Sequence, residues 1–341
     1  MRIISIISAI AGLALIGGLL AYFGAGAVIR SLLAVGWTGF SAICLIHLAV
    51  ISVMGIAWRV LVPGAPLWVF LWGRLIRDAG SEVLPFSQMG GCVLGARVVT
   101  LAGVPGTIAA ASMMVDLTLE FLAKLAYLVL GLILLVHLRR DTPVAFPVTI
   151  GLTATGLFAV AFVVVQRHGF DLFGRFARIL GRRWAARMAA AAAFHTALVQ
   201  THQRRARLWV GFLLHLVCWI ASAVQVWIAL RFAGAPLGFG TVLVIESLLY
   251  GVRTVAFAIP NAVGVQEGAY VLIGATFGLT PEMALALSLM KRARDLVIGL
   301  PALGVWQAVE GGRIWRHIVA LRRRTAGTGT SSLQPLRRRK L

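Results

Sequence analysis

The chain has 341 residues, of which 60% are hydrophobic and only 13% are charged, and its mean hydropathy is +0.92. These values lie far from those of soluble globular proteins and indicate a membrane protein, which excludes a soluble enzyme and a disordered regulator. The formal net charge of +21 would ordinarily raise nucleic acid as a partner, but burial in a membrane argues against it.

Apolar runs long enough to cross a membrane recur along the chain. A spanning helix needs roughly 20 mainly apolar residues for a hydrocarbon core of about 30 Å. The clearest runs are residues 3–23, 37–57, 108–136, 144–165, 208–230 and 239–258. Shorter or glycine-broken runs are residues 66–76, 84–104, 263–279, 281–290 and 296–309. We therefore predict an all-α polytopic bundle of seven to nine passes, with re-entrant or broken helices.

The first run is predicted to be a retained helix, because about twenty apolar residues exceed the 7 to 15 of a signal peptide. The three cysteines, Cys44, Cys92 and Cys218, lie in apolar runs without a CxxC pair or a histidine at ligand spacing. We therefore expect packing roles for them, and no disulfide framework, metal or cofactor.

Two basic segments divide the chain into an N-terminal membrane half (1–165), a loop (166–207), a C-terminal membrane half (208–311) and a disordered tail (312–341). The loop holds nine arginines against one acid, Asp171, so both basic segments are predicted to be cytoplasmic. An even number of passes then separates them, which requires residues 263–279 to cross fully and residues 281–309 to make one long or broken pass. Apolar side chains at helical spacing in the loop predict an interfacial amphipathic helix, or a segment packed on the membrane face of the protein.

A weak internal repeat appears at an offset of 175 residues, which lays Leu84-Pro85 on Ile259-Pro260 and Gly103 on Gly278. With a slip of one residue, Pro105 also aligns with Pro281. Each stretch carries a GxxxG pattern, Gly91/Gly95 in one and Gly264/Gly268 in the other. Paired interruptions of this kind indicate a transporter-like central site, whereas close packing at small residues is the alternative interpretation.

Ionised side chains in the apolar runs are the main functional signal, since each uncompensated charge costs about 2.5–3.5 kcal/mol on insertion scales. Asp116, Glu120 and Lys124 are spaced by four residues and share one stripe of a helix. We expect Glu120 to pair with Lys124. The candidate cations for Asp116 are Arg97, Arg253, Arg292 and Arg294. A ligand cavity and a charge network that only fixes helix register both remain open.

Two further polar segments interrupt the C-terminal half. In residues 260–268, Pro260 and Gly264 break the helix while Asn261, Gln266 and Glu267 offer hydrogen-bonding groups, although a polar turn would look the same. The run from Lys291 to Asp295 either holds a lipid phosphate or marks a helix break. His47 and His215 are interpreted as core histidines without a visible carboxylate partner.

Several of these residues carry a family resemblance. Glu82-Val-Leu-Pro85 with Gly90-Gly91, the helix with Asp116 and Glu120, and residues 260–268 resemble the membrane region of lysylphosphatidylglycerol synthases and their stand-alone flippase-like relatives. The similarity covers about residues 3–311. Residues 87–97 most resemble the hopanoid-biosynthesis-associated subgroup called HpnL.

The resemblance implies a polytopic protein of the bacterial inner membrane that moves or handles polar lipids between leaflets. It implies functional roles for Glu82, Asp116, Glu120 and Glu267, with Pro85, Pro260 and Gly264 shaping the helix breaks. The full synthases append a soluble aminoacyl-transfer domain after the membrane region. This chain has a basic tail there, so aminoacylation is not expected.

Three functions are compatible with the sequence. The first is a flippase-like lipid transporter, without an enzymatic activity. The others are a scaffold that binds lipid-biosynthesis enzymes at the cytoplasmic face, and an intramembrane enzyme acting on lipid headgroups. The candidate residues of a substrate pathway are Glu82, Arg97, Asp116, Glu120, Lys124, Arg253, Glu267, Arg292, Arg294 and Asp295.

Overall fold

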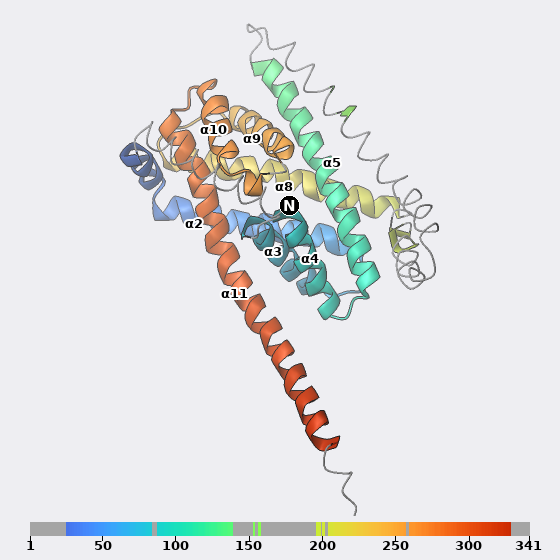
Figure 1. Ribbon diagram of the computed structural model, residues 1–341. Coiled ribbons are helices and arrows are strands. Elements are labelled where there is room, and N and C mark those ends of the chain that lie inside the picture. Colours follow the sequence, from blue (N-terminus) through green and yellow to red (C-terminus); the bar gives the residue numbers. More distant parts are fainter. Residues whose placement is uncertain are drawn as a thin grey trace, which may run out of the picture.

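The computed structural model describes the backbone of residues 25–83, 87–138, 204–256 and 259–328, with a few short pieces between residues 153 and 201. Within these ranges every regular element is helical, which confirms the predicted all-α membrane fold (Figure 1). The elements are α2 (Ala25–Leu61), α3 (Leu67–Val83), α4 (Ser87–Leu101), α5 (Gly106–Leu138), α8 (Arg205–Phe232), α9 (Phe239–Val255), the 3₁₀ turn η2 (Pro260–Ala262), α10 (Val265–Ala275) and α11 (Pro281–Thr328). The runs 3–23 and 144–165, most of the basic loop, and Pro85 lie outside the described residues.

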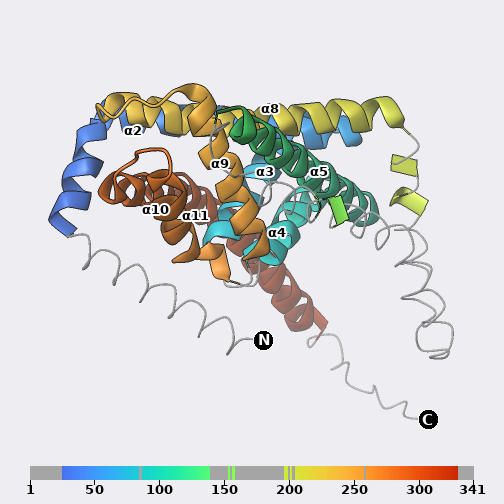
Figure 2. The ribbon, with the colours of Figure 1, turned by 90° about the horizontal axis from the view of Figure 1, so that it is seen from above.

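Three helices of the described part, α2, α5 and α8, are long and apolar enough to cross a membrane. At about 1.5 Å per residue, even the shortest of them, α8, is longer than a hydrocarbon core of about 30 Å. Figure 2 shows α2 and α8 lying side by side along one edge of the molecule. The backbone of α2 bends at Gly36, whose φ of 66° leaves the helical region, so its first turns point away from the rest of the helix.

The described helices fall into two groups with the same order. In α2–α5 and again in α8–α11, a long helix precedes a helix of 17 residues, a shorter helix and a second long helix. A glycine with positive φ follows each shorter helix, Gly103 at 97° and Gly278 at 81°, where other residues would be strained. This order agrees with the repeat that the paired prolines and glycines predict. We call α2–α5 the first half and α8–α11 the second half.

The two halves interlock through their last helices. Helix α5 packs against α8 and α9 of the second half, and α11 packs against α2 and α3 of the first half. Helices α2 and α8 pack against each other between these contacts. The main apolar core includes buried side chains from both halves, among them Tyr127 of α5 and Tyr270 of α10. The space between the halves is therefore filled mostly by apolar packing.

Glycines bring α3 and α4 into close contact as a helical hairpin. A Cβ on Gly95 would lie 3.0 Å from the carbonyl oxygen of Gly73, and one on Gly91 would collide with backbone atoms of α3. The first GxxxG pattern is therefore a packing motif. The second pattern differs, because Gly264 has a φ of 80° and a Cβ on Gly268 would meet nothing within 4 Å.

The structure corrects one expectation for the second half and decides between two alternatives in another. Helix α10 has 11 residues, or about 16 Å, and is too short to cross a membrane alone, so residues 263–279 do not form a full pass. Residues 281–290 and 296–309 belong to the single helix α11, which agrees with the alternative of one long pass, and the charged run from Lys291 lies inside this helix. The backbone of residues 312–328 continues α11.

Candidate functional site

A buried ion-pair cluster joins α3 to α5. Arg74 and Arg77, one turn apart on α3, both reach Glu120, with Nη1 of Arg74 at 3.0 Å and Nη2 of Arg77 at 2.7 Å from Oε2. Their Nη1 atoms also lie 3.5 and 3.3 Å from Oδ2 of Asp116. Arginine suits this site because its planar group donates to two carboxylates at once. We call these four residues the arginine cluster.

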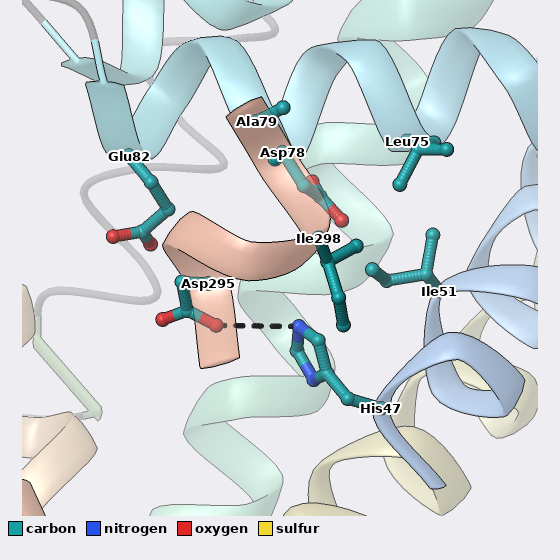
Figure 3. A pocket seen from close by; sticks show the side chains of 9 residues that line it. His47, Ile51, Leu75, Asp78, Ala79, Glu82, Asp295 and Ile298 are labelled. Carbon is teal, nitrogen blue, oxygen red and sulfur yellow. Dashed lines mark ion pairs between the residues drawn. The ribbon is translucent and has the colours of Figure 1, made fainter. Parts of the chain in front are cut away.

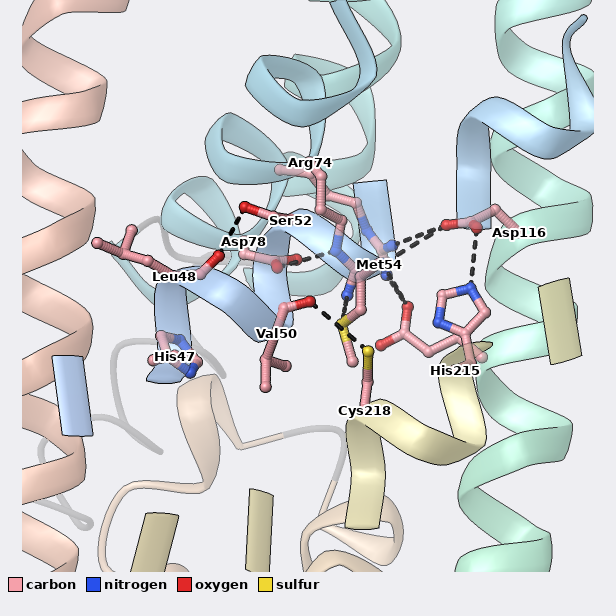
Figure 4. Close-up of polar contacts among 12 residues, drawn as sticks. His47, Leu48, Val50, Ser52, Met54, Arg74, Asp78, Asp116, His215 and Cys218 are labelled. Atoms are coloured by element: carbon pink, nitrogen blue, oxygen red, sulfur yellow. Dashed lines mark hydrogen bonds and ion pairs between the residues drawn. The ribbon is translucent and has the colours of Figure 1, made fainter. Parts of the chain in front are cut away.

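Two further helices complete the arginine cluster, as Figure 4 shows. Nε2 of His215 on α8 lies 2.9 Å from Oδ1 of Asp116, and Nη2 of Arg74 lies 2.9 Å from the sulfur of Met54 on α2. The side chain of Asp116 is 0% exposed, so no ligand reaches it in this conformation. Asp116 therefore belongs to a buried charge network that fixes helix register, which is one of the two alternatives that the sequence allowed.

The expected pairing of this helix stripe is wrong in two respects. Glu120 pairs with the two arginines of α3, and Nζ of Lys124 lies 4.7 Å from the centroid of the Trp219 ring, in a cation–π contact. The cations of Asp116 are Arg74 and Arg77 of α3, not the four candidates named above, and the ring of His215 contacts its other oxygen. The sequence analysis had treated Arg74 and Arg77 only as topology signals and His215 as unpaired.

A second buried cluster joins the three helices α9, α10 and α11. Nζ of Lys291 lies 2.8 Å from Oε2 of Glu246 and 3.1 Å from the hydroxyl of Tyr270, which donates to the other oxygen of Glu246. All three side chains are buried. The charge of Lys291 is thus neutralised inside the protein and does not face a ligand.

Glu267 stabilises the helix break of residues 260–264. One of its oxygens accepts a hydrogen bond from the backbone N–H of Gly264 at 2.8 Å, and Nε of Arg292 donates to the other at 2.7 Å. Asn261 next to Pro260 has a φ of 50°, and its side-chain oxygen accepts from Nη2 of Arg253 at 3.1 Å. Glu267 and Arg292 therefore shape the backbone between α9 and α10.

A pocket that carries candidate residues lies between α2, α3 and α11 (Figure 3). It is small, with a volume of about 20 Å³. Its ionisable lining is His47, Asp78, Glu82 and Asp295, and its apolar lining includes Ile51, Leu75 and Ile298. Figure 3 shows Glu82, Asp295 and the ring of His47 around one opening.

The carboxylates of this pocket have cations nearby, some of them at long range. Nε2 of His47 lies 3.5 Å from Oδ1 of Asp295, which also accepts from Arg294 at 2.6 Å. Nη2 of Arg253 lies 3.7 Å from Oε1 of Glu82, beyond hydrogen-bond distance. His47, like His215, thus has a carboxylate partner that the sequence did not reveal.

The structure brings only part of the predicted pathway together. Glu82 and Asp295 line the pocket, and Arg253 and Arg294 contact them. Arg97 instead pairs with Glu310 at 3.0 Å, with a side chain 52% exposed, away from the pocket lining. Asp116 and Glu120 belong to the arginine cluster, Lys124 contacts Trp219, and Glu267 and Arg292 pair at the helix break. Within the described ranges, no group of three or more His, Cys, Asp or Glu side chains is arranged to hold a metal ion.

Comparison with known proteins places the chain in a family. Neither a characterised protein nor a solved structure matches it. The family described as the lysylphosphatidylglycerol synthase TM region matches residues 9–302. The match includes all described helices except residues 303–328 of α11. The chain is a membrane protein of the lysylphosphatidylglycerol synthase TM-region family.

Proposed function

We propose that the protein is a flippase-like transporter that moves or handles a polar lipid between the leaflets of the bacterial inner membrane, which it crosses several times. The supporting observation is the pocket between α2, α3 and α11. It sets the ionisable groups of His47, Glu82 and Asp295 beside apolar side chains. An amphiphilic molecule needs both kinds of surface, one for its headgroup and one for the start of its chains.

A binding and transport role fits the pocket better than catalysis. Asp295 is tied to Arg294 at 2.6 Å, and Glu82 faces Arg253. Both carboxylates are thereby placed where they can position a ligand. The resemblance of residues 87–97 to the hopanoid-associated subgroup supports a hopanoid-related lipid as the substrate, and a phospholipid is the alternative. No nucleic acid is expected among the partners.

The proposal is tested by reconstituting the purified protein into liposomes that carry a fluorescent phospholipid or a fluorescent hopanoid lipid. The fraction of label accessible to a membrane-impermeant quencher is followed with time. We expect faster transbilayer movement than in protein-free vesicles for at least one of the two lipids. Movement equal to that in empty vesicles for both lipids would reject the transporter.

One observation favours a scaffold as a second candidate. Helix α11 continues well beyond the packed bundle in Figure 1, and its extension carries Arg313, Arg316 and Arg322 to Arg324 in the sequence. A basic projecting helix can bind lipid-biosynthesis enzymes or anionic headgroups. Replacing Arg322, Arg323 and Arg324 by glutamine separates the two functions. If this variant changes lipid distribution in cells while Asp295→Asn and Glu82→Gln do not, the scaffold explains the protein better.

A further inference from the structure

Two histidines connect the halves of the protein in the same way. Nε2 of His47 on α2 lies 3.5 Å from Oδ1 of Asp295 on α11, and Nε2 of His215 on α8 lies 2.9 Å from Oδ1 of Asp116 on α5. Each histidine therefore reaches from the first helix of one half to the last helix of the other. In both rings Nδ1 is buried without a hydrogen-bond partner in the described part of the chain. The two contacts are reciprocal.

The two contacts differ in how far they are exposed to solvent and in their length. Both side chains of the His215–Asp116 pair are 0% exposed, and its distance is that of a normal hydrogen bond. The side chains of His47 and Asp295 are 21% and 16% exposed, they border the pocket, and 3.5 Å is too long for a strong hydrogen bond. The His215–Asp116 contact is thus fully buried and short, and the His47–Asp295 contact is partly exposed and longer.

Glycines bring α5 close to α9 and α11 close to α3. On α5, 15 residues along the helix from Asp116, a Cβ on Gly131 would collide with the side chain of Ser247 on α9. At the open contact, α11 meets α3, and a Cβ on Gly299 would lie 3.3 Å from Cβ of Ala79, in a wall of the pocket. We call the packing of α5 against α8 and α9 the closed junction, and that of α11 against α2 and α3 the open junction.

We propose that the two junctions are alternating gates, and that the structure shows one of two states. In the other state the His47–Asp295 contact closes the pocket and the His215–Asp116 contact opens. Two halves with the same helix order can exchange roles in this way, because each supplies the same kind of contact to the other. The inference rests on the proposed function, since a headgroup must reach its binding site from each side in turn.

Cysteine labelling tests the exchange without measuring lipid movement. Ala79→Cys reports on the open junction and Ser247→Cys on the closed one, each in a chain whose native Cys44, Cys92 and Cys218 are replaced by serine. Reaction with a water-soluble methanethiosulfonate is followed in proteoliposomes. We expect the cysteine at position 79 to react several-fold faster than that at position 247.

The decisive comparison uses His215→Ala, which weakens the closed junction. If the junctions alternate, this variant raises the labelling rate at position 247 and lowers it at position 79. His47→Ala is the matched control and should lower the rate at position 247. Should His215→Ala fold poorly, Gly131→Ala also disfavours the closed junction and should lower the rate at position 79.

Labelling rates that rise together at both positions, or a change at one position only, would contradict the proposal that the junctions alternate. A protein that moves lipid in liposomes but shows no reciprocal change in labelling would keep the proposed function and lose this inference. A protein with reciprocal labelling and no lipid movement would keep the alternating junctions and lose the proposed transport function.

Discussion

Asp116 and Lys291 occupy equivalent positions with opposite charges, since each lies ten residues after the first residue of the long helix that ends its half. Their partners are also equivalent. Arg74 and Glu246 each lie seven residues after the start of a 17-residue helix. The Arg74–Asp116 distance is 3.5 Å and the Lys291–Glu246 distance is 2.8 Å. Both halves thus hold an ion pair at the same place with reversed polarity.

The reversed polarity predicts the outcome of a charge swap in the second half. Glu246→Lys and Lys291→Glu alone each place two like charges in a buried site, so each variant should lose most of its folded protein. The double variant restores an ion pair with the polarity of the first half, and we expect it to recover part of the folded yield. The measurement is monodisperse protein in detergent by size-exclusion chromatography. A double variant no better than either single variant would contradict the equivalence.

The arginine cluster predicts a large stability loss for Asp116→Asn. Removal of this carboxylate leaves buried arginine charge with one carboxylate fewer, and breaking a buried ion pair costs about 3–5 kcal/mol of unfolding free energy. Thermal unfolding in detergent should therefore show a clearly lower Tm. Arg97→Gln is the control, because its exposed pair with Glu310 contributes about 0–1 kcal/mol. Equal Tm values for both variants would show that the cluster does not stabilise the fold.

Glycine substitutions should have opposite effects in the two GxxxG patterns. Gly91→Val forces a side chain into the backbone of α3 and should cost about 1–3 kcal/mol or more of stability. Gly268→Ala meets open space inside a helix and should be neutral or stabilising by about 0.5–1 kcal/mol. Tm values in detergent measure both. A destabilised Gly268→Ala protein would mean that α10 contacts something at this position.

Lipid movement should depend on the pocket more than on the surface. Asp295→Asn removes the charge that faces both His47 and the opening, and we expect it to slow movement several-fold in liposomes while the protein remains folded. Glu310→Gln removes a carboxylate of the exposed pair on the same helix and should leave the rate unchanged. Equal rates of lipid movement in the two variants would show that the pocket does not contribute to transport.

The sequence predicted the helical membrane fold and the interruption of its second half, because apolar runs, prolines and glycines act locally. Gly103 and Gly278 adopt positive φ where the offset of 175 residues aligned them. Helix α11 was harder to foresee. Its charged run from Lys291 to Asp295 was compatible with a phosphate site or a helix break. Lys291 and Arg294 of this run find partners on neighbouring helices, and the helix is continuous.

The pairing of charges could not be predicted, because it depends on which helices meet. Glu120 and Lys124 have a favourable spacing for an ion pair on one helix. Glu120 pairs instead with Arg74 of α3. The reversed polarity of the two halves also hides their relation from any comparison of residue types. A search for opposite charges at equal distances from paired helix starts would have matched Arg74 with Glu246 and Asp116 with Lys291.

Photo-crosslinking tests most directly whether the pocket receives a lipid headgroup. A lipid with a photoreactive group on its headgroup is incorporated into proteoliposomes with the protein, and the adducts are mapped by mass spectrometry. We predict adducts near His47 on α2, near Glu82 on α3 and near Asp295 on α11, and fewer of them in Asp295→Asn. Adducts confined to exposed side chains such as Trp37 and Leu272, and unchanged by this substitution, would contradict the account.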